Sequence, residues 1–226
     1  MSVELLYHTP EPERAIAAAA RLCYAPIGAA ELFEELDDAA IRRVLRTVLK
    51  SGHLSTLEHA SYTFAIDGVS RAMTHQLVRH RLASYNQQSQ RYVGFDGPPP
   101  FIIPPEVAAD PERKAAFLAA CEAAFASYRA LVEAGVALED ARYLLPNATE
   151  TKITVTMNVR ELLHFFTLRC CRRAQWEIRA VANEMLELAR PTAPYIFLDA
   201  GAGCRRGPCP EGKMCCGDPY PRIVRD

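Results

Sequence analysis

The sequence predicts an α+β fold: a single layered domain with a central, mostly antiparallel sheet flanked by long helices. Half of the 226 residues are apolar, which is enough for a sizeable core. Short stretches with alternating or β-branched residues are separated by long alanine-rich stretches, as in layered domains that mix strands and helices. We expect residues 1–200 to form this domain and residues 201–226 to form a cysteine-rich C-terminal tail.

Three segments are predicted to be strands. SVELLYHT (residues 2–9) and SYTFAI (residues 61–66) alternate between apolar and polar side chains, and Asp67-Gly68 is expected to end the second strand. KITVTMNV (residues 152–159) is rich in β-branched residues.

The helices are predicted from alanine-rich composition, proline at the start and glycine or proline at the end. In the stretch that starts at Ala29, acidic residues come early and basic ones late, which suits the helix dipole. The proline-rich segment 97–106 is expected to be a rigid connection without regular structure. The expected helices cover residues 12–24, 29–50, 69–80, 111–135 and 160–189.

Composition also limits the classes of partner. The net charge is −1, so no overall electrostatic attraction draws the protein to nucleic acid or to an anionic membrane. No stretch looks apolar and uncharged for long enough to span a bilayer, and the N-terminus lacks a secretory layout. We therefore expect a cytoplasmic protein that binds neither membrane nor nucleic acid.

The segment from Arg79 to Arg91 concentrates binding chemistry. It holds three arginines and many amides and hydroxyls but no carboxylate. Such a set suits an oxyanion or a polar heterocycle. Guanidinium groups form bidentate hydrogen bonds with phosphate, and side-chain amides can hydrogen-bond with both the donors and the acceptors of a ring. Gln76, Arg79 and His80 are expected to share one helix face. A solvated polar loop is the alternative on composition alone.

The order of the residues goes further than their composition. RHRLASYNQQSQRY (residues 79–92) resembles the signature of the flavin-dependent thymidylate synthases. Three more blocks are similar to family elements and follow in the same order: HLSTLEH (53–59), DARYLLP (140–146) and NVRELLHFFTLRCCRRAQWEIR (158–179). The resemblance thus extends over most of the chain.

This resemblance implies an activity and an assembly. The expected reaction is FAD-dependent reductive methylation of dUMP to dTMP, with 5,10-methylenetetrahydrofolate as carbon donor and NADPH as reductant. No protein nucleophile is expected. The resemblance further implies a homotetramer whose active sites lie at subunit interfaces.

The resemblance also assigns residues position by position. Arg169 matches the catalytic arginine that stabilises the ionised ring nitrogen of uracil, a role that suits guanidinium. Gln87 and His164 stand where some members have glutamate and asparagine, and both still hydrogen-bond. The cofactor-binding positions are Ser55, Arg79, His80, Arg81, Gln87, Asn158, Val159, Arg160 and His164. The substrate-binding positions are Gln76, Leu77, Val78, Arg79, Gln87, Gln88, Ser89, Gln90, Arg91, Arg142 and Arg169.

Helix geometry constrains three of these positions. Arg160 and His164 are four residues apart and share a face, whereas Arg169 is turned about 140° from His164 on a straight helix. One helix face cannot present all three side chains to one small ligand. Either the ligands spread widely or Arg169 faces a different site from Arg160, and we favour the second.

The eight cysteines fall into two groups. Cys170 and Cys171 are expected to pack in the middle of an amphipathic helix rather than to act as nucleophiles. The tail has the spacing C-x4-C-x5-C-C, which is not a standard zinc knuckle. We predict no metal there and a reduced or loosely ordered tail with redox-formed disulfides. A zinc or iron–sulfur site is the alternative, with the ligands Cys204, Cys209, Cys215 and Cys216.

Two other functions compete with the enzyme prediction. A nucleic-acid-binding protein would use the Arg79–Arg91 segment and a zinc-binding tail, although no basic stripe supports it. A histidine-rich metalloenzyme would use His53, His59, His75 and His80, but no compact pattern such as H-E-x-x-H is present.

Overall fold

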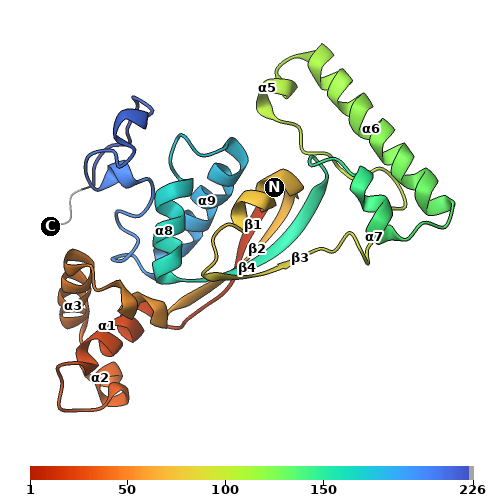
Figure 1. Cartoon of the computed structure of the whole chain (residues 1–226). Helices are drawn as coiled ribbons and strands as arrows, with labels where there is room; N and C mark the ends of the chain where they lie inside the picture. The colour runs from red at the N-terminus through yellow and green to blue at the C-terminus, as the bar shows by residue number, and fades with distance from the viewer. Residues whose placement is uncertain (224–226) are drawn as a thin grey trace. The chain divides into compact units, whose positions relative to one another are not determined.

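The computed structural model of the chain describes residues 1–223 and has an α+β architecture (Figure 1). The strands are β1 (Ser2–His8), β2 (Ser61–Ser70), β3 (Ala83–Gln87) and β4 (Glu150–Asn158). The helices are α1 (Pro12–Leu22), α2 (Ala29–Glu35), α3 (Asp38–Ser51), α4 (Arg71–Leu77), α5 (Pro105–Ala108), α6 (Pro111–Glu133), α7 (Leu138–Ala141), α8 (Val159–Arg169) and α9 (Trp176–Ala189). Short 3₁₀ helices are η1 (Leu54–His59), η2 (Arg142–Leu144), η3 (Arg190–Thr192), η4 (Gly203–Arg205) and η5 (Gly212–Met214).

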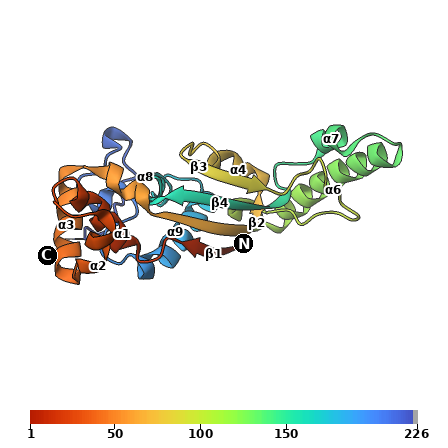
Figure 2. The ribbon, with the colours of Figure 1, turned by 90° about the horizontal axis from the view of Figure 1, so that it is seen from below.

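The four strands form one sheet in the order β1-β2-β4-β3 (Figure 2). Backbone hydrogen bonds join the end of one strand to the start of its neighbour, as in antiparallel pairs. These bonds run from Thr9 N to Ser61 O, from Val159 N to Ala60 O and from Gln88 N to Lys152 O. The prediction of an antiparallel sheet within an α+β fold is therefore confirmed.

The chain divides into two compact units, each built from several segments. Unit 1 contains Met1–Ser2, Ile66–Arg79 and Tyr85–Thr154. Unit 2 contains Val3–Ala65, His80–Ser84 and the chain from Val155 onward. Residues 201–223 belong to unit 2, while the last three residues of the expected tail lie outside the described part of the chain. The domain boundary at residue 200 stays a prediction.

Unit 2 has a core of large apolar side chains. Helices α8 and α9 pack against each other (Figure 1). Phe165, Phe166, Val181, Met185 and Phe197 are fully buried. Burying side chains of this size is the main driving force for ordering the two helices, and it fixes the side chains that α8 presents elsewhere.

Unit 1 contains the long helix α6. Asp110 caps it, because its side chain accepts hydrogen bonds from the amides of Glu112 and Arg113. Phe125 and Tyr128 on α6 form a small core with Ala141 and neighbouring apolar side chains. By length and composition alone α6 could cross a membrane, although such a test also selects core helices of water-soluble proteins. One such helix is only a weak indication of a membrane span, and α6 carries charged residues such as Glu122 and Arg129, so the expectation that no long uncharged stretch spans a bilayer stays a prediction.

Several predicted element bounds differ from the observed ones. The helix expected over residues 29–50 is two helices, because Asp37 caps α3 by accepting from Ala40 N. The strand expected to end at Ile66 continues to Ser70, with Gly68 at φ 68° inside it. The helix expected over residues 160–189 breaks between α8 and α9. The proline-rich segment includes the short helix α5, and β3 was not predicted at all.

Candidate active site

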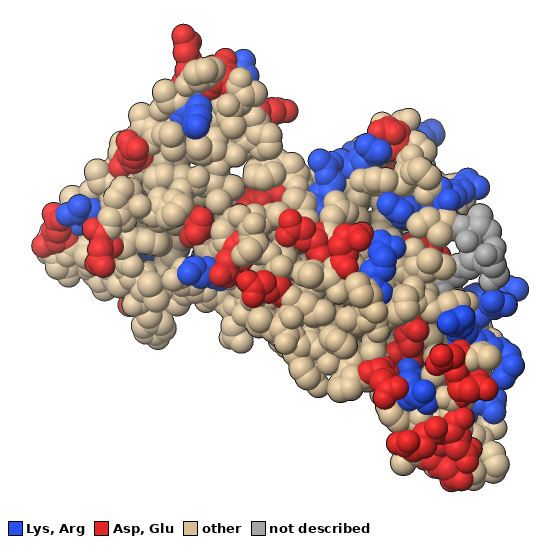
Figure 3. Space-filling model, turned by 180° about the vertical axis from the view of Figure 1, so that it is seen from behind, with Lys and Arg blue, Asp and Glu red and all other residues tan. Residues whose placement is uncertain are grey.

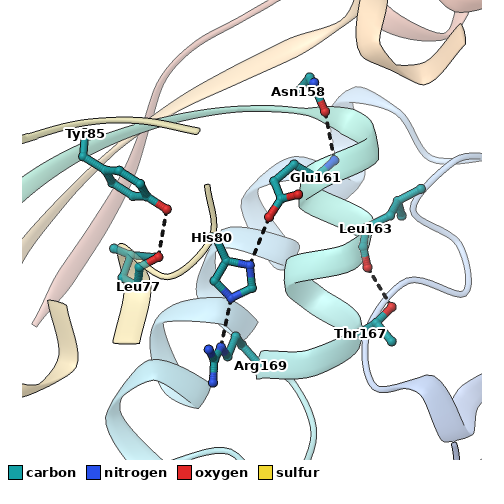
Figure 4. A network of polar contacts seen from close by, with 8 residues as sticks. All are labelled: Leu77, His80, Tyr85, Asn158, Glu161, Leu163, Thr167 and Arg169. Carbon is teal, nitrogen blue, oxygen red and sulfur yellow. Dashed lines mark hydrogen bonds and ion pairs between the residues drawn. The ribbon is translucent and has the colours of Figure 1, made fainter. Parts of the chain in front are cut away.

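A buried polar chain links three side chains of unit 2 (Figure 4). Glu161 Oε1 lies 3.0 Å from His80 Nδ1, and Arg169 Nε donates to His80 Nε2 at 3.0 Å. His80 and Glu161 are only 5% and 6% exposed. Buried polar groups of this kind cost free energy unless they are paired, so the chain holds all three side chains in one arrangement.

The protonation of His80 follows from its two partners. A guanidinium has no acceptor, so Arg169 must donate and His80 Nε2 must be unprotonated. The single ring proton then lies on Nδ1 and is donated to the Glu161 carboxylate. Burial lowers the pKa of His80, although Glu161 acts in the opposite direction and the positive charge of Arg169 reinforces the effect. His80 is therefore neutral near pH 7.

Local sequence explains how α8 presents these groups. Asn158 is the N-cap of the helix, and its side chain accepts from Glu161 N at 2.9 Å. Glu161 then stands in the first turn, where a carboxylate is favoured by the helix dipole. Arg169 is the last residue of the helix, where a cation is favoured. Burial lowers the pKa of Arg169, yet a guanidinium stays charged at neutral pH.

A cavity of about 990 Å³ lies within unit 2, beside the hydrogen-bonded side chains Glu161, His80 and Arg169. That is near the upper end of ligand-site volumes, so it suits a large ligand. Glu161 and His164 belong to its wall, as do the cations Arg46, Lys50, Arg160 and Arg206. Thr167 and Asp199 also line the cavity, and apolar side chains supply the remaining surface: Leu49, Leu54, Leu57, Leu82, Leu163 and Ile196.

One predicted cofactor position, His80, lies between Glu161 and Arg169, and the other eight separate into three groups. Arg160 and His164 line the cavity, and Ser55 and Arg81 are next in sequence to its wall residues Leu54 and Leu82. Asn158 and Val159 have structural roles. The Asn158 side chain caps α8. Val159 is fully buried, and its amide donates to Ala60 O, which indicates a packing role. Arg79 and Gln87 belong to unit 1.

Most predicted substrate positions lie in unit 1. The Gln87 amide donates to the hydroxyls of Thr74 and Thr151, at 3.0 and 3.3 Å. Both threonines are buried, so they fix the orientation of the Gln87 side chain. Ser89 Oγ accepts from Arg91 N, which shapes the turn after β3.

A group of arginines also lies in unit 1. Arg91 pairs with Glu139, and Arg142 Nε donates to the Glu139 carbonyl oxygen. Burial and the nearby charge of Arg142 both lower the pKa of Arg71. Two guanidinium groups close enough to repel each other form a natural site for an anion.

Two geometric expectations can be compared with the structure. Gln76, Arg79 and His80 do not share a helix face, because α4 ends at Leu77 and the chain turns before Arg79. This prediction was wrong. Arg160 and Arg169 do diverge on α8, since Arg160 pairs with Glu58 at 2.6 Å while Arg169 contacts His80.

Two residues were missed by sequence reasoning. Glu161 lies inside a matched block, but its position three residues after Asn158 is also typical of a helix-capping pattern, which hides its contact with His80. Arg71 follows the N-cap Ser70 and precedes the signature, so no motif singled it out. A long-range contact identifies each, and neither leaves a local sequence signal.

Burial disfavours Cys170 as a nucleophile. Burial raises the pKa of the Cys170 thiol to about 12, so the thiol is protonated at neutral pH. Cys170 and Cys171 follow the end of α8 rather than lying in the middle of a helix, which corrects their predicted location. Within residues 1–223, no group of three or more histidine, cysteine or acidic side chains is arranged to hold a metal ion.

Comparison with known proteins decides the family. The family model described as "Thymidylate synthase complementing protein" matches residues 4–195. A flavin-dependent thymidylate synthase from Geobacter sulfurreducens is 59% identical over 218 residues, which cover 96% of this chain and 94% of that protein. The chain belongs to the flavin-dependent thymidylate synthase family. A family member from Clostridium tetani is 47% identical, with 96% and 93% of the two chains covered.

Solved structures agree with this membership. The flavin-dependent thymidylate synthase of Helicobacter pylori, solved with FAD and dUMP, matches with a TM-score of 0.71 at 27% identity, covering 89% of this chain and all of that one. A UMP/dUMP methylase from Streptomyces cacaoi, bound to 5-Br dUMP, matches with a TM-score of 0.74 at 27% identity. That alignment covers 87% of this chain and 93% of the methylase. On the face drawn in Figure 3, the basic and the acidic side chains gather in several separate groups rather than in one basic stripe.

Proposed function

We propose that this protein catalyses the FAD-dependent reductive methylation of dUMP to dTMP. The carbon would come from 5,10-methylenetetrahydrofolate and the reducing equivalents from NADPH. The observation that carries this proposal is the large cavity of unit 2, with Arg160 and His164 in its wall and the chain Glu161–His80–Arg169 beside it. Family membership supports the same reaction.

The cavity suits FAD by its chemistry. Four cations in the wall, Arg46, Lys50, Arg160 and Arg206, can neutralise the pyrophosphate of the cofactor. The leucines of the same wall can cover an aromatic ring system. FAD, when bound, supplies the hydride for the methylation, and the protein contributes binding, orientation and electrostatics.

Arg169 is proposed as the catalytic residue. Its Nε is held by His80 Nε2, so the orientation of the guanidinium is set before substrate binds. A preoriented cation stabilises the negative charge that develops on the uracil ring in the transition state. Glu161 acts through His80 and is therefore a positioning residue.

The arginines of unit 1 are proposed to bind the phosphate of dUMP. Arg142 is one of the matched substrate positions, and Arg71 is held close enough for its pKa to be lowered by that charge. A dianionic phosphate would relieve the repulsion between the two guanidinium groups. Gln87, whose amide nitrogen donates to two threonines, retains its carbonyl oxygen as a hydrogen-bond acceptor for a substrate donor such as a sugar hydroxyl.

We further propose that the protein works as a cytoplasmic homotetramer. The support is the family resemblance together with the exposure of Ser55, Arg79 and Arg81, which leaves these three side chains available to a neighbouring subunit. Light scattering of the purified protein measures the assembly directly. A monomer that is fully active would contradict this part of the proposal.

Flavin content and turnover test the proposed reaction. The purified protein should absorb near about 450 nm, as flavins do, and NADPH should bleach this band without oxygen. A protein that stays colourless after incubation with FAD would refute the cofactor assignment. Arg169→Ala should keep the absorbance but lose dTMP formation, whereas Arg129→Ala, an exposed arginine on α6, should retain both. Normal turnover by Arg169→Ala would refute its catalytic role.

A further inference from the structure

The C-terminal tail contributes one side chain to the large cavity of unit 2. The family model ends at residue 195, whereas the cavity wall includes Arg206. Four cations stand in this wall against two carboxylates, those of Glu161 and Asp199. Without Arg206 the excess of positive charge would fall from two to one, so the tail supplies much of the attraction that the cavity has for an anion.

Arg206 is held in one orientation by neutral oxygens. One of its terminal nitrogens donates to the carbonyl oxygens of Asp199 and Gly201, at 3.1 and 3.3 Å. The other donates to Thr167 Oγ1 at 2.6 Å, and the Thr167 hydroxyl donates in turn to Leu163 O on α8 (Figure 4). These bonds orient the guanidinium without cancelling its charge. They use at most three of its five N–H donors, so the others can donate to a ligand.

The end of the tail folds back onto the residue before Arg206. The Tyr220 ring packs against two guanidinium groups, with its centre 4.5 Å from that of Arg172 and 5.1 Å from that of Arg205. Ile223 N also donates to Arg205 O at 3.1 Å. Because Arg172 lies between α8 and α9, these contacts fasten the backbone that carries Arg206 to the body of unit 2.

We propose that residues 201–223 form a strap that holds Arg206 in the cavity to bind the pyrophosphate of FAD, and that the contacts of Tyr220 control this binding. The inference rests on the proposed function, in which FAD occupies the cavity. Arg206 is then a binding residue, and Tyr220 is a positioning residue that acts through it. Guanidinium suits the role because it can donate two parallel hydrogen bonds to phosphate oxygens.

Equilibrium dialysis of FAD against the flavin-free, full-length protein tests the role of Arg206. The dissociation constant should rise roughly tenfold in Arg206→Gln, because a charge-assisted hydrogen bond to the cofactor is lost. Lys213→Gln is the matched control, since it removes an exposed cation of the same tail that is not part of the cavity wall, and it should leave the constant unchanged. Unchanged affinity in Arg206→Gln would overturn the inference.

Riboflavin separates phosphate binding from a change in cavity shape. It has the flavin ring but no phosphate, so the unaltered protein and Arg206→Gln should bind it equally. If Arg206→Gln weakened riboflavin and FAD by the same factor, the assignment of Arg206 to the pyrophosphate would be wrong. An unaltered protein that binds neither FAD nor riboflavin would refute the proposed function itself, and the strap with it.

Variants of Tyr220 test whether this ring acts through Arg206. Tyr220→Ala should weaken FAD binding by a smaller factor than Arg206→Gln, and Tyr220→Phe, which keeps the ring, should restore the affinity. When Tyr220→Ala is combined with Arg206→Gln, it should add nothing, because the side chain that it positions is already gone. Two effects that add in full would show that Tyr220 does not position Arg206.

Discussion

Replacing Glu161 by alanine tests whether the buried polar chain positions Arg169. The substitution removes the acceptor for the proton on His80 Nδ1. That nitrogen lies 3.0 Å from Glu161 Oε1, and the two residues are only 5% and 6% exposed. An unsatisfied buried donor costs about 1–3 kcal/mol of unfolding free energy. For a chain of this length that corresponds to a melting temperature lower by roughly 2–4 °C per kcal/mol.

The same substitution should reduce turnover more than substrate binding. Without Glu161, the His80 ring can place its proton on Nε2, and that nitrogen then repels Arg169 Nε instead of accepting from it. A misplaced guanidinium lowers kcat by roughly 10- to 100-fold. The assay is dTMP formation at saturating dUMP, with the melting temperature measured on the same samples.

Two further variants serve as a conservative comparison and as a control. Glu161→Gln keeps an acceptor for His80 but not the charge, so its loss of stability should be about 1 kcal/mol, smaller than that of alanine. Glu133→Ala removes an exposed glutamate paired with Arg129 and should cost no more than about 0.5 kcal/mol. If Glu161→Ala kept the melting temperature and kcat of the unaltered protein, the positioning argument would be refuted.

Three further predictions concern other features. Since burial lowers the pKa of His80 in the fold, the unfolded chain takes up that proton first, so the free energy of unfolding should fall as pH drops below about 6.5. Denaturant titrations should show a weaker pH dependence in His80→Asn, and an unchanged dependence contradicts the predicted shift. Arg71→Gln should raise KM for dUMP while kcat stays constant, and an unaltered KM excludes Arg71 from phosphate binding. Asp110→Ala removes the cap of α6 and should cost about 0.5–2 kcal/mol in thermal unfolding, whereas no loss would show that the cap is dispensable.

The family could be predicted from the sequence because the order of residues in the signature carries more information than their composition. The antiparallel sheet was predictable where one strand face is buried, as in β2, whose Tyr62, Phe64 and Ile66 alternate with less buried residues. β3 was not predicted because it is an edge strand with the polar sequence ASYNQ, which shows no alternation of apolar and polar residues.

The breaks inside the long predicted helices also could not be recognised from the sequence. Residues 29–50 are mostly good helix formers, and the division at Asp37 depends on a side-chain cap rather than on a proline or glycine. The contact between His80 and Glu161 joins residues 81 positions apart, so no periodicity could reveal it. Local patterns therefore located the candidate site, while its internal bonding required the fold.

The interleaving of the two units restricts how this protein can be taken apart. The chain passes from one unit to the other at residues 2–3, 65–66, 79–80, 84–85 and 154–155. Neither unit is therefore encoded by one continuous stretch of gene, and a single exchange between two related genes cannot swap either unit whole. One of the crossings falls inside the arginine–histidine–arginine triplet itself, between Arg79 and His80. A recombinant joined there would inherit its two arginines from different parents, so we expect chimeras within this family to survive only when the signature is transferred intact.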